Sequence, residues 1–121
     1  EKVLGNCKEE IIDKGGYIFF ALHKSDVVGT MALIPREEGV YELNKMAVRK
    51  DLRGNGIGNK LIEFIISYSK DKNYSSIILY SNTVLKNSIH LYNKFGFKEI
   101  DNPDAPYKRS DIKMELKLSG F

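Results

Sequence analysis

The sequence predicts an α/β (α+β) fold, in which helices flank a mixed central β-sheet. Apolar runs of strand length at 17–22, 27–34 and 40–48 follow one another through short polar turns, which is typical of an antiparallel meander. A glycine-rich turn and an amphipathic stretch then lead from the third run to a fourth at 75–80. This is the order of a right-handed βαβ unit, so the third and fourth strands should be parallel.

The first elements follow from composition and from breaking residues. Residues 8–14 have a helical composition, and Gly15 and Gly16 are expected to end that helix. The run at 17–22 is almost continuously apolar, as in a strand that is covered on both faces. It should form a hairpin with 27–34, followed by a polar loop at 35–39.

The strand at 40–48 has a defect in its alternation of side chains. Leu43 and Met46 should face the same side, but three residues separate them where alternation requires an even step. One extra residue near Asn44–Lys45, a β-bulge, would restore the register and move this part of the strand away from its neighbour. The alternative is a strand that simply ends early.

The segment 58–72 has the spacing of an amphipathic helix, and Asn73 is suited to the left-handed conformation that would end it. A second helix is expected at about 85–95, capped by Asn82 or Thr83.

Gly96 should end that second helix, because glycine favours the position after a helix C-terminus. In the second helix Leu85, Ile89, Tyr92 and Phe95 are expected to face inward. Strands at 97–100 and 111–118 close the chain. The last strand is expected at an edge of the sheet, where it could pair with a second subunit in a homodimer.

The composition is that of one domain, residues 1–121, with 42% hydrophobic and 29% charged residues. No apolar run approaches the roughly 20 residues that span a bilayer, and no signal peptide opens the chain. Cys7 is the single cysteine and the chain has two histidines, so neither an internal disulfide nor a structural zinc site is expected. A cytoplasmic, metal-free protein is the resulting expectation.

The glycine-rich turn after the third strand reads Arg53-Gly54-Asn55-Gly56-Ile57-Gly58. Glycines at alternate positions let backbone N–H groups converge on a ligand, and the following helix directs its positive end to the same place. The segment from Lys45 to Lys60 carries five basic residues and one acidic residue, a local charge of +4 against +3 for the whole chain. The turn is therefore suited to a phosphate or pyrophosphate, the alternative being an ordinary strand-to-helix loop.

Two familiar nucleotide motifs do not fit this turn. A dinucleotide-binding fingerprint needs glycine where Asn59 stands, and a P-loop needs lysine directly after the last glycine, where the chain has Asn59 before Lys60. The net charge of +3 is also too small to indicate nucleic acid, and aromatic residues do not alternate with the basic ones here.

The turn instead resembles the R/Q-x-x-G-x-G/A signature of the GCN5-related N-acetyltransferase (GNAT) superfamily. A second segment, Leu91-Tyr92-Asn93-Lys94-Phe95-Gly96-Phe97, is similar to the L-Y-x-K-x-G-F segment of the same family. The two motifs occur in the family's order and on the expected elements. The resemblance covers about residues 16–118, and it implies the GNAT acyl-coenzyme A acyltransferase fold with its first strand and helices missing from the N-terminus.

The resemblance implies a coenzyme A site, with acetyl-coenzyme A as co-substrate and no metal. The turn would hold the pyrophosphate, and the backbone edge of the bulged strand would hold the pantetheine arm. Asn87 would contribute from the second helix, although an ordinary polar helix residue is as good an interpretation. The implied cofactor-binding residues are Met46, Ala47, Val48, Arg53, Gly54, Asn55, Gly56, Ile57, Gly58, Asn87 and Tyr92.

The resemblance also implies direct acetyl transfer to a primary amine in a ternary complex. Tyr92 matches the tyrosine that serves as general acid to the departing thiolate, the alternative being a role in packing. Glu42 matches a base that acts directly or through water, the alternative being an exposed strand residue. A backbone N–H near Met46 or Ala47 would meet the oxyanion.

Other interpretations and the acceptor stay open at this point. The chain could be a non-catalytic module that binds acetyl-coenzyme A as a sensor or structural ligand. The acceptor could be a small amine or an amine of a peptide or protein. No nucleic acid or membrane partner is expected. His23, His90 and Cys7 lie outside any nucleophile motif, so no covalent acyl-enzyme is expected.

Overall fold

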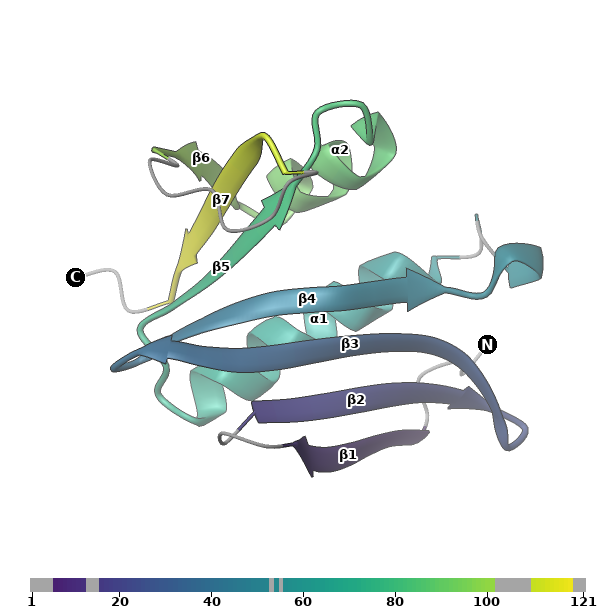
Figure 1. Ribbon diagram of the computed structural model, residues 1–121. Coiled ribbons are helices and arrows are strands. Elements are labelled where there is room, and N and C mark those ends of the chain that lie inside the picture. The colour runs from purple at the N-terminus through teal and green to yellow at the C-terminus, as the bar shows by residue number, and fades with distance from the viewer. Residues whose placement is uncertain (1–5, 13–15, 53, 55, 102–109, 119–121) are drawn as a thin grey trace.

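In the computed structural model the described residues are 6–12, 16–52, 54, 56–101 and 110–118, with the backbone alone described for 6–12 and Lys45. Seven described strands form one sheet in the order β1-β2-β3-β4-β5-β7-β6, with α1 behind β3 and β4 and α2 beside the β5–β7 half (Figure 1). Only the β4–β5 neighbours are parallel. The elements are β1 Asn6–Ile12, β2 Gly16–His23, β3 Asp26–Glu37, β4 Val40–Val48, α1 Ile57–Asp71, β5 Ser76–Ser81, α2 Lys86–Lys94, β6 Lys98–Ile100 and β7 Ile112–Lys117.

The predicted bulge in β4 is confirmed by the pairing with β3. Thr30 pairs with Ala47 and Ala32 pairs with Asn44, so a two-residue step on β3 faces a three-residue step on β4. The extra residue lies in β4 between Asn44 and Ala47, where the alternation of side chains required it.

β4 and β5 are paired only at their beginnings. The parallel register runs from Val40 opposite Ser76 to Glu42 opposite Ile78, and beyond it no described strand pairs with β4 on this side. Figure 1 shows the two strands moving apart, with β1–β4 in one half of the sheet and β5–β7 in the other. The sheet therefore opens in its middle, where the chain passes from β4 through α1 to β5.

The buried stripe of α1 fastens the helix to the sheet. Leu61, Ile62 and Ile65 are fully buried and pack with Phe19, Met31, Leu33 and Leu43 of the meander and with Ile77 and Leu79 of β5. Gly29 on β3 makes a close approach possible, since a Cβ built there would lie 3.1 Å from Leu61 Cδ1. Asn73, with φ of 62°, ends the helix region as predicted.

The end of α2 agrees with prediction and its beginning does not. Gly96 has φ of 98°, and the N–H groups of Gly96 and Phe97 bond the carbonyls of Asn93 and Tyr92, which is a Schellman motif. Neither Asn82 nor Thr83 is the N-cap. Leu85 occupies that position and is 52% exposed, so its predicted inward orientation is also wrong.

Asp111 explains why the cap prediction failed. Its carboxylate accepts hydrogen bonds from Thr83 N and Thr83 Oγ1, both at 2.8 Å. The Asn82 side chain accepts from Val84 N at 2.9 Å. Both predicted cap residues therefore stabilise the turn that precedes the helix.

Three further predictions are corrected by the strands. Residues 8–12 belong to β1, an antiparallel partner of β2, and not to a helix. The loop predicted at 35–39 is mostly strand, since β3 continues to Glu37. The last strand, β7, is not at an edge, because it lies between β5 and β6. β5 pairs with β7 along its whole length, and β6 pairs with its middle three residues, so β7 is not the edge strand that was predicted.

Candidate active site

A cavity of about 810 Å³ lies where β4 ends, α1 begins and α2 crosses nearby. It contains every described residue that the sequence predicted for the cofactor, whereas Arg53 and Asn55 lie outside the described residues. We call it the turn cavity. Its predicted lining residues are Met46, Ala47, Val48, Gly54, Gly56, Ile57, Gly58, Asn87 and Tyr92.

The glycine turn leaves the floor of this cavity bare. Gly54 and Gly56 have φ of 88° and 80°, and a Cβ built on either would meet nothing within 4 Å. Gly56 is the N-cap of α1 without a side-chain cap, and the first turn of the helix has no acidic residue. The first N–H groups of a helix have no intrahelical carbonyl to bond, and they carry the partial positive charge of the helix N-terminus. In α1 these groups lie beside the bare glycine turn.

The acidic residue of this segment is already paired. Asp51 accepts hydrogen bonds from Arg49 Nε at 2.7 Å and Arg49 Nη2 at 3.1 Å. The hydrogen bond from Arg49 holds the pKa of the Asp51 carboxyl below its usual value, and the same bond raises the pKa of Arg49. Asp51 therefore stays ionised and bound to Arg49, and does not neutralise the glycine turn.

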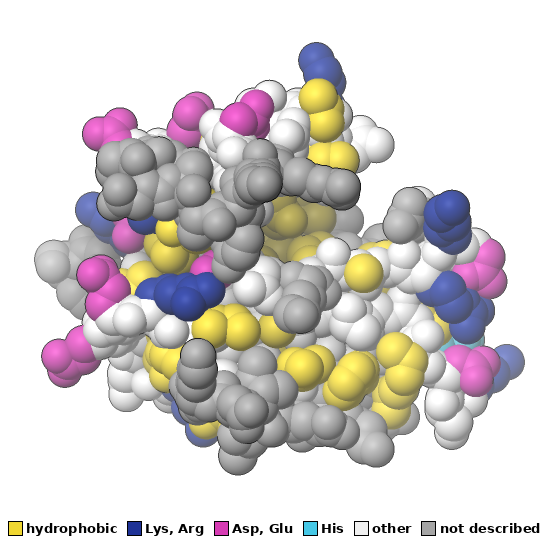
Figure 2. Space-filling model, viewed as in Figure 1, with side chains coloured by type: hydrophobic (Ala, Val, Ile, Leu, Met, Phe, Trp, Pro, Cys, Tyr) yellow, Lys and Arg dark blue, Asp and Glu magenta, His cyan; other side chains and the backbone are white. Residues whose placement is uncertain are grey.

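A second cavity, of about 730 Å³, occupies the opening between β4 and β5. Figure 2 shows a hollow between the two halves of the molecule, with hydrophobic side chains on its floor. We call this the cleft cavity. Its described lining is Glu42, Leu43, Asn44, Met46, Leu79, Tyr80, Ser81, Asn82, Val84, Leu85, Ser88, Tyr92 and Ser110.

Tyr92 lies at the junction of the two cavities. It lines both of them, as do Met46, Val84, Leu85 and Ser88, so the two cavities adjoin each other. The ring packs beside Phe97, with the centroids 5.9 Å apart. Burial raises the pKa of the Tyr92 phenol, so it stays protonated at neutral pH. The side chain therefore packs in the fold and also lines both cavities.

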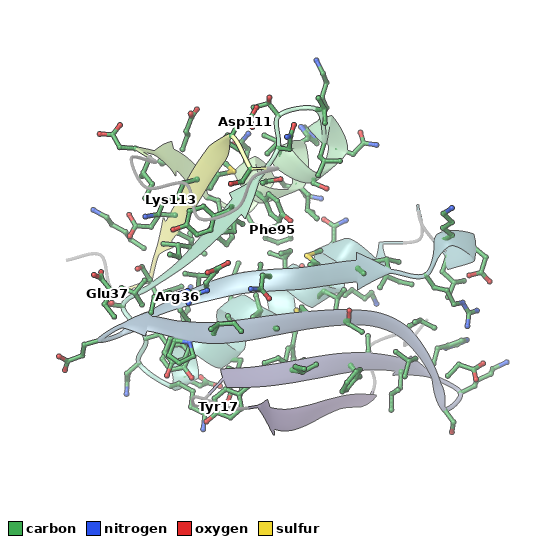
Figure 3. All side chains as sticks on the ribbon, viewed as in Figure 1. Tyr17, Arg36, Glu37, Phe95, Asp111 and Lys113 are labelled. Atoms are coloured by element: carbon green, nitrogen blue, oxygen red, sulfur yellow. The ribbon has the colours of Figure 1, made fainter. Side chains whose placement is uncertain are left out.

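Glu42 faces the cleft cavity but is only 1% exposed, so the interpretation of an exposed strand glutamate is wrong. Arg36 from β3 contacts its Oε1, with Nε at 2.7 Å and Nη2 at 2.6 Å. Asn44 Nδ2 donates to Oε2 at 3.3 Å. Both oxygens of the carboxylate are therefore engaged. In Figure 3 Arg36 lies in the β1–β4 half, and Asp111 lies across the opening in the other half.

Several site residues were not found from the sequence. Arg36 was placed in a polar loop, so nothing suggested that it reaches Glu42 across the β3–β4 pair. Asn44 was seen only as a marker of the bulge. Asn59 and Lys94 line the turn cavity and bond each other at 2.7 Å, although they are 35 residues apart in the chain. Contacts between separate elements have no signal in the spacing of residues.

No helix in the part of the chain that the structure describes has the length and apolar character needed to cross a membrane. Within the same residues, no three His, Cys, Asp or Glu side chains are grouped in a way that could hold a metal ion.

A mixed sheet that opens between two parallel strands, beside a glycine turn that begins a helix, is the architecture of the GNAT acyltransferase fold. The sequence profile of the Acetyltransferase (GNAT) family matches residues 4–97, and the chain belongs to this family. The N-acetylaspartate synthetase of Xenopus tropicalis is 35% identical over 88 residues, covering 71% of this chain and 32% of that protein. The chain spans less than half of the length of the first curated relatives that it matches.

Solved structures agree with this assignment. An acetyltransferase of the GNAT family from Staphylococcus aureus has a TM-score of 0.80 and 27% identity, covering 90% of this chain and 72% of that chain. A GNAT acetyltransferase from Elizabethkingia anophelis, solved with acetyl-coenzyme A bound, has a TM-score of 0.74 and 21% identity, covering 85% of this chain and 76% of that chain. Because the identity to the Elizabethkingia anophelis protein is only 21%, this similarity shows the fold alone.

Proposed function

We propose that this chain transfers an acetyl group from acetyl-coenzyme A directly to a primary amine, within a ternary complex. The observation that carries the proposal is Tyr92, a protonated phenol that lines both the turn cavity and the cleft cavity. Two adjoining cavities would hold the two substrates next to each other, and holding reactants in position is a large part of catalysis.

The turn cavity has the features that coenzyme A requires. Gly54 and Gly56 leave room for the pyrophosphate against the first N–H groups of α1. Arg53 and Asn55 belong to the same proposed turn on the strength of the sequence motif. The edge of β4 beside the bulge would take the pantetheine arm, and Asn87 in the first turn of α2 would add a polar contact.

In this proposal Tyr92 is the general acid. The thiolate that leaves coenzyme A needs a proton or a hydrogen bond, and a phenol with a raised pKa keeps its proton until that point. A backbone N–H of Met46 or Ala47 would meet the negative charge that develops on the carbonyl oxygen of the acetyl group. Those residues lie where β4 has left β5, so the strand edge is within reach of the cleft.

The base is proposed to be Glu42 acting through water. A lysine-like amine has a pKa of about 10.4, so it must lose a proton before it attacks. Direct contact is unfavourable, because the carboxylate is 1% exposed and Arg36 and Asn44 already engage its oxygens. A water molecule in the cleft could pass the proton to Glu42 without breaking these contacts.

The described lining of the cleft cavity limits the acceptor. Glu42 is its one charged side chain, and Arg36 balances that charge. A polyamine needs several carboxylates, so an acceptor with a single amine is favoured, either a small molecule or the amine of a peptide or protein. The frog relative is named for the synthesis of N-acetylaspartate, and the amino acid from which that product forms is an acceptor of this kind. The reaction would take place in the cytoplasm.

The test is release of thiol from acetyl-coenzyme A over a panel of amines, with the parent protein and Tyr92→Phe. One class of amine should be acetylated, and Tyr92→Phe should lose roughly ten- to hundredfold or more in kcat while coenzyme A affinity changes little. Equal rates for the two proteins would remove Tyr92 from the chemistry.

A second function is favoured by one observation. Because both oxygens of Glu42 are engaged, the site could hold acetyl-coenzyme A without turning it over, as a sensor or structural module. Tight binding of acetyl-coenzyme A with no thiol release across the panel would support this module. Absence of binding would contradict both functions.

A further inference from the structure

Lys94 reaches from α2 to the beginning of α1. Its Nζ donates to Asn59 Oδ1 at 2.7 Å, and both residues line the turn cavity. Asn59 is the third residue of α1, so the ammonium group lies beside the first turn of that helix. An ammonium has three N–H donors, and the bond to Asn59 uses one of them.

Lys94 places a positive charge near the positive end of α1. The N-terminus of a helix carries a partial positive charge, and cations are favoured at the other end. The first turn of α1 contains no acidic residue and Gly56 supplies no side-chain cap. Asp51 does not compensate, because Arg49 binds its carboxylate with two hydrogen bonds. Within the described residues, two positive groups therefore meet around an open space and lack an anion.

We infer that Lys94 binds the pyrophosphate of coenzyme A together with the first turn of α1, and that Asn59 positions its ammonium group for this contact. The inference rests on the proposed coenzyme A site and adds a binding residue from a second helix. Lys94 Nζ also lies 5.7 Å from the ring centroid of Phe95, the residue that follows it. Because Lys94 belongs to α2, a pyrophosphate bound to Lys94 and to the first turn of α1 would link the two helices across the turn cavity.

The first experiment measures the affinity for coenzyme A, for dephospho-coenzyme A, which lacks the 3′-phosphate, and for acetylated pantetheine, which lacks all phosphates. Lys94→Gln should weaken coenzyme A and dephospho-coenzyme A by the same factor, roughly three- to tenfold, because one charge-assisted contact is lost. The pantetheine compound should be unaffected. The control is Lys98→Gln, which removes the same charge from an exposed position of β6 that lines neither cavity.

Each outcome decides the inference. A loss confined to coenzyme A would assign Lys94 to the 3′-phosphate and overturn the pyrophosphate contact. Equal affinities for the parent protein and Lys94→Gln would overturn any phosphate contact while leaving the coenzyme A site in place. If the parent protein binds none of the three compounds, the proposed function itself fails, and that result is distinct from the first two.

Asn59→Asp gives a second test, in which stability should rise while the affinity for coenzyme A falls. The new carboxylate has nearly the same shape, pairs with Lys94 and places a negative charge in the first turn of α1, which stabilises a helix. The variant should therefore melt at a higher temperature than the parent protein, yet bind coenzyme A at least tenfold more weakly, because the carboxylate occupies the place of the anion. Unchanged affinity in a more stable variant would overturn the inference.

Discussion

Tyr92 and Glu42 line the same cleft cavity, but their side chains have different neighbours. The phenol is partly buried and packs beside Phe97, and this burial raises its pKa. The carboxylate is buried and forms an ion pair with Arg36. The two residues differ through their neighbours, and one of these neighbours, Arg36, comes from another strand.

Removing the partner of Glu42 should be costly. Arg36→Met leaves a carboxylate that is 1% exposed without its ion pair, so we expect a loss of roughly 1–3 kcal/mol in the free energy of unfolding. This expected loss of stability is smaller than for a fully buried ion pair, because the Arg36 side chain is 42% exposed. Urea unfolding measures it.

The matched control is the double variant Arg36→Met with Glu42→Gln, which removes the charge that was left alone. It should recover part of the lost stability. Glu42→Gln alone measures the cost of the second substitution. If the double variant is less stable than Arg36→Met by that full cost, the two side chains act independently.

Tyr74 gives a pH-dependent prediction. Burial raises the pKa of this phenol, assisted by a hydrogen bond with Tyr41, whose ring stacks on it with centroids 3.8 Å apart. In the unfolded chain the phenol ionises at a pKa of about 10, but in the folded chain it stays protonated to higher pH. The unfolded state therefore releases the proton first, and stability should fall as the pH rises above about 10.

Urea unfolding at about pH 9 and about pH 11 tests this, because the two values lie on either side of the ordinary tyrosine pKa. Tyr74→Phe should lose less stability between the two pH values than the parent protein loses. The expectation fails if the two proteins lose the same amount.

Among the elements, the contact between α1 and β3 depends on a missing side chain. A Cβ at Gly29 would lie 3.1 Å from Leu61 Cδ1 and 3.3 Å from the Ala47 carbonyl oxygen. Gly29→Ala should therefore move the helix or strain the strand and cost about 1–3 kcal/mol of unfolding free energy.

The same substitution in α1 should have the opposite effect. At Gly58 the nearest atom to a new Cβ is Leu91 Cδ2 at 3.4 Å, an ordinary contact, and alanine is a better helix former by about 1 kcal/mol. Gly58→Ala should thus be neutral or stabilising in the same urea experiment. Equal losses for the two variants would mean that the packing of α1 does not explain the effect at Gly29.

The sequence predicted those features that depend on residues close together in the chain. The bulge followed from the parity of Leu43 and Met46, and the end of α2 followed from Gly96. The segment at 8–12 failed because its residues favour a helix in isolation, while in the fold every one of them pairs with β2. The cap of α2 failed because Asp111, which is remote in sequence, takes the Thr83 hydroxyl.

At the scale of the whole molecule, the order of the strands was only partly predictable. The parallel β4–β5 pair followed from the βαβ order, because a crossover helix returns the chain to the end of the sheet where the first strand began. The insertion of β7 between β5 and β6 has no such rule, because either of the last two strands could lie next to β5. The two motifs predicted the glycines of the turn cavity and Tyr92, whereas most of the cleft cavity lining was not predicted. The contact of Lys94 with Asn59 depended on how the helices meet.

Acetyl-coenzyme A should stabilise the entire fold, because its proposed site draws on both halves of the sheet and both helices. At a concentration of 100 times Kd, binding to the native state alone adds about 2.7 kcal/mol to the free energy of unfolding. For a chain of 121 residues this corresponds to a rise in Tm on the order of 10 °C.

Thermal melts over a series of acetyl-coenzyme A concentrations measure this rise. Sodium chloride at matched ionic strength controls for general screening of the basic segment. A Tm that does not change with the concentration of acetyl-coenzyme A would contradict the proposed site.

The opening between β4 and β5 has a consequence for the protein in the cell. An unpaired strand edge is a template for another chain, and most proteins keep such edges at the margin of a sheet, where charges or short strands protect them. Here the edge lies in the interior and would be covered by a metabolite. We expect the ligand-free protein to be the form that aggregates or is degraded. Its abundance would then follow the supply of acetyl-coenzyme A.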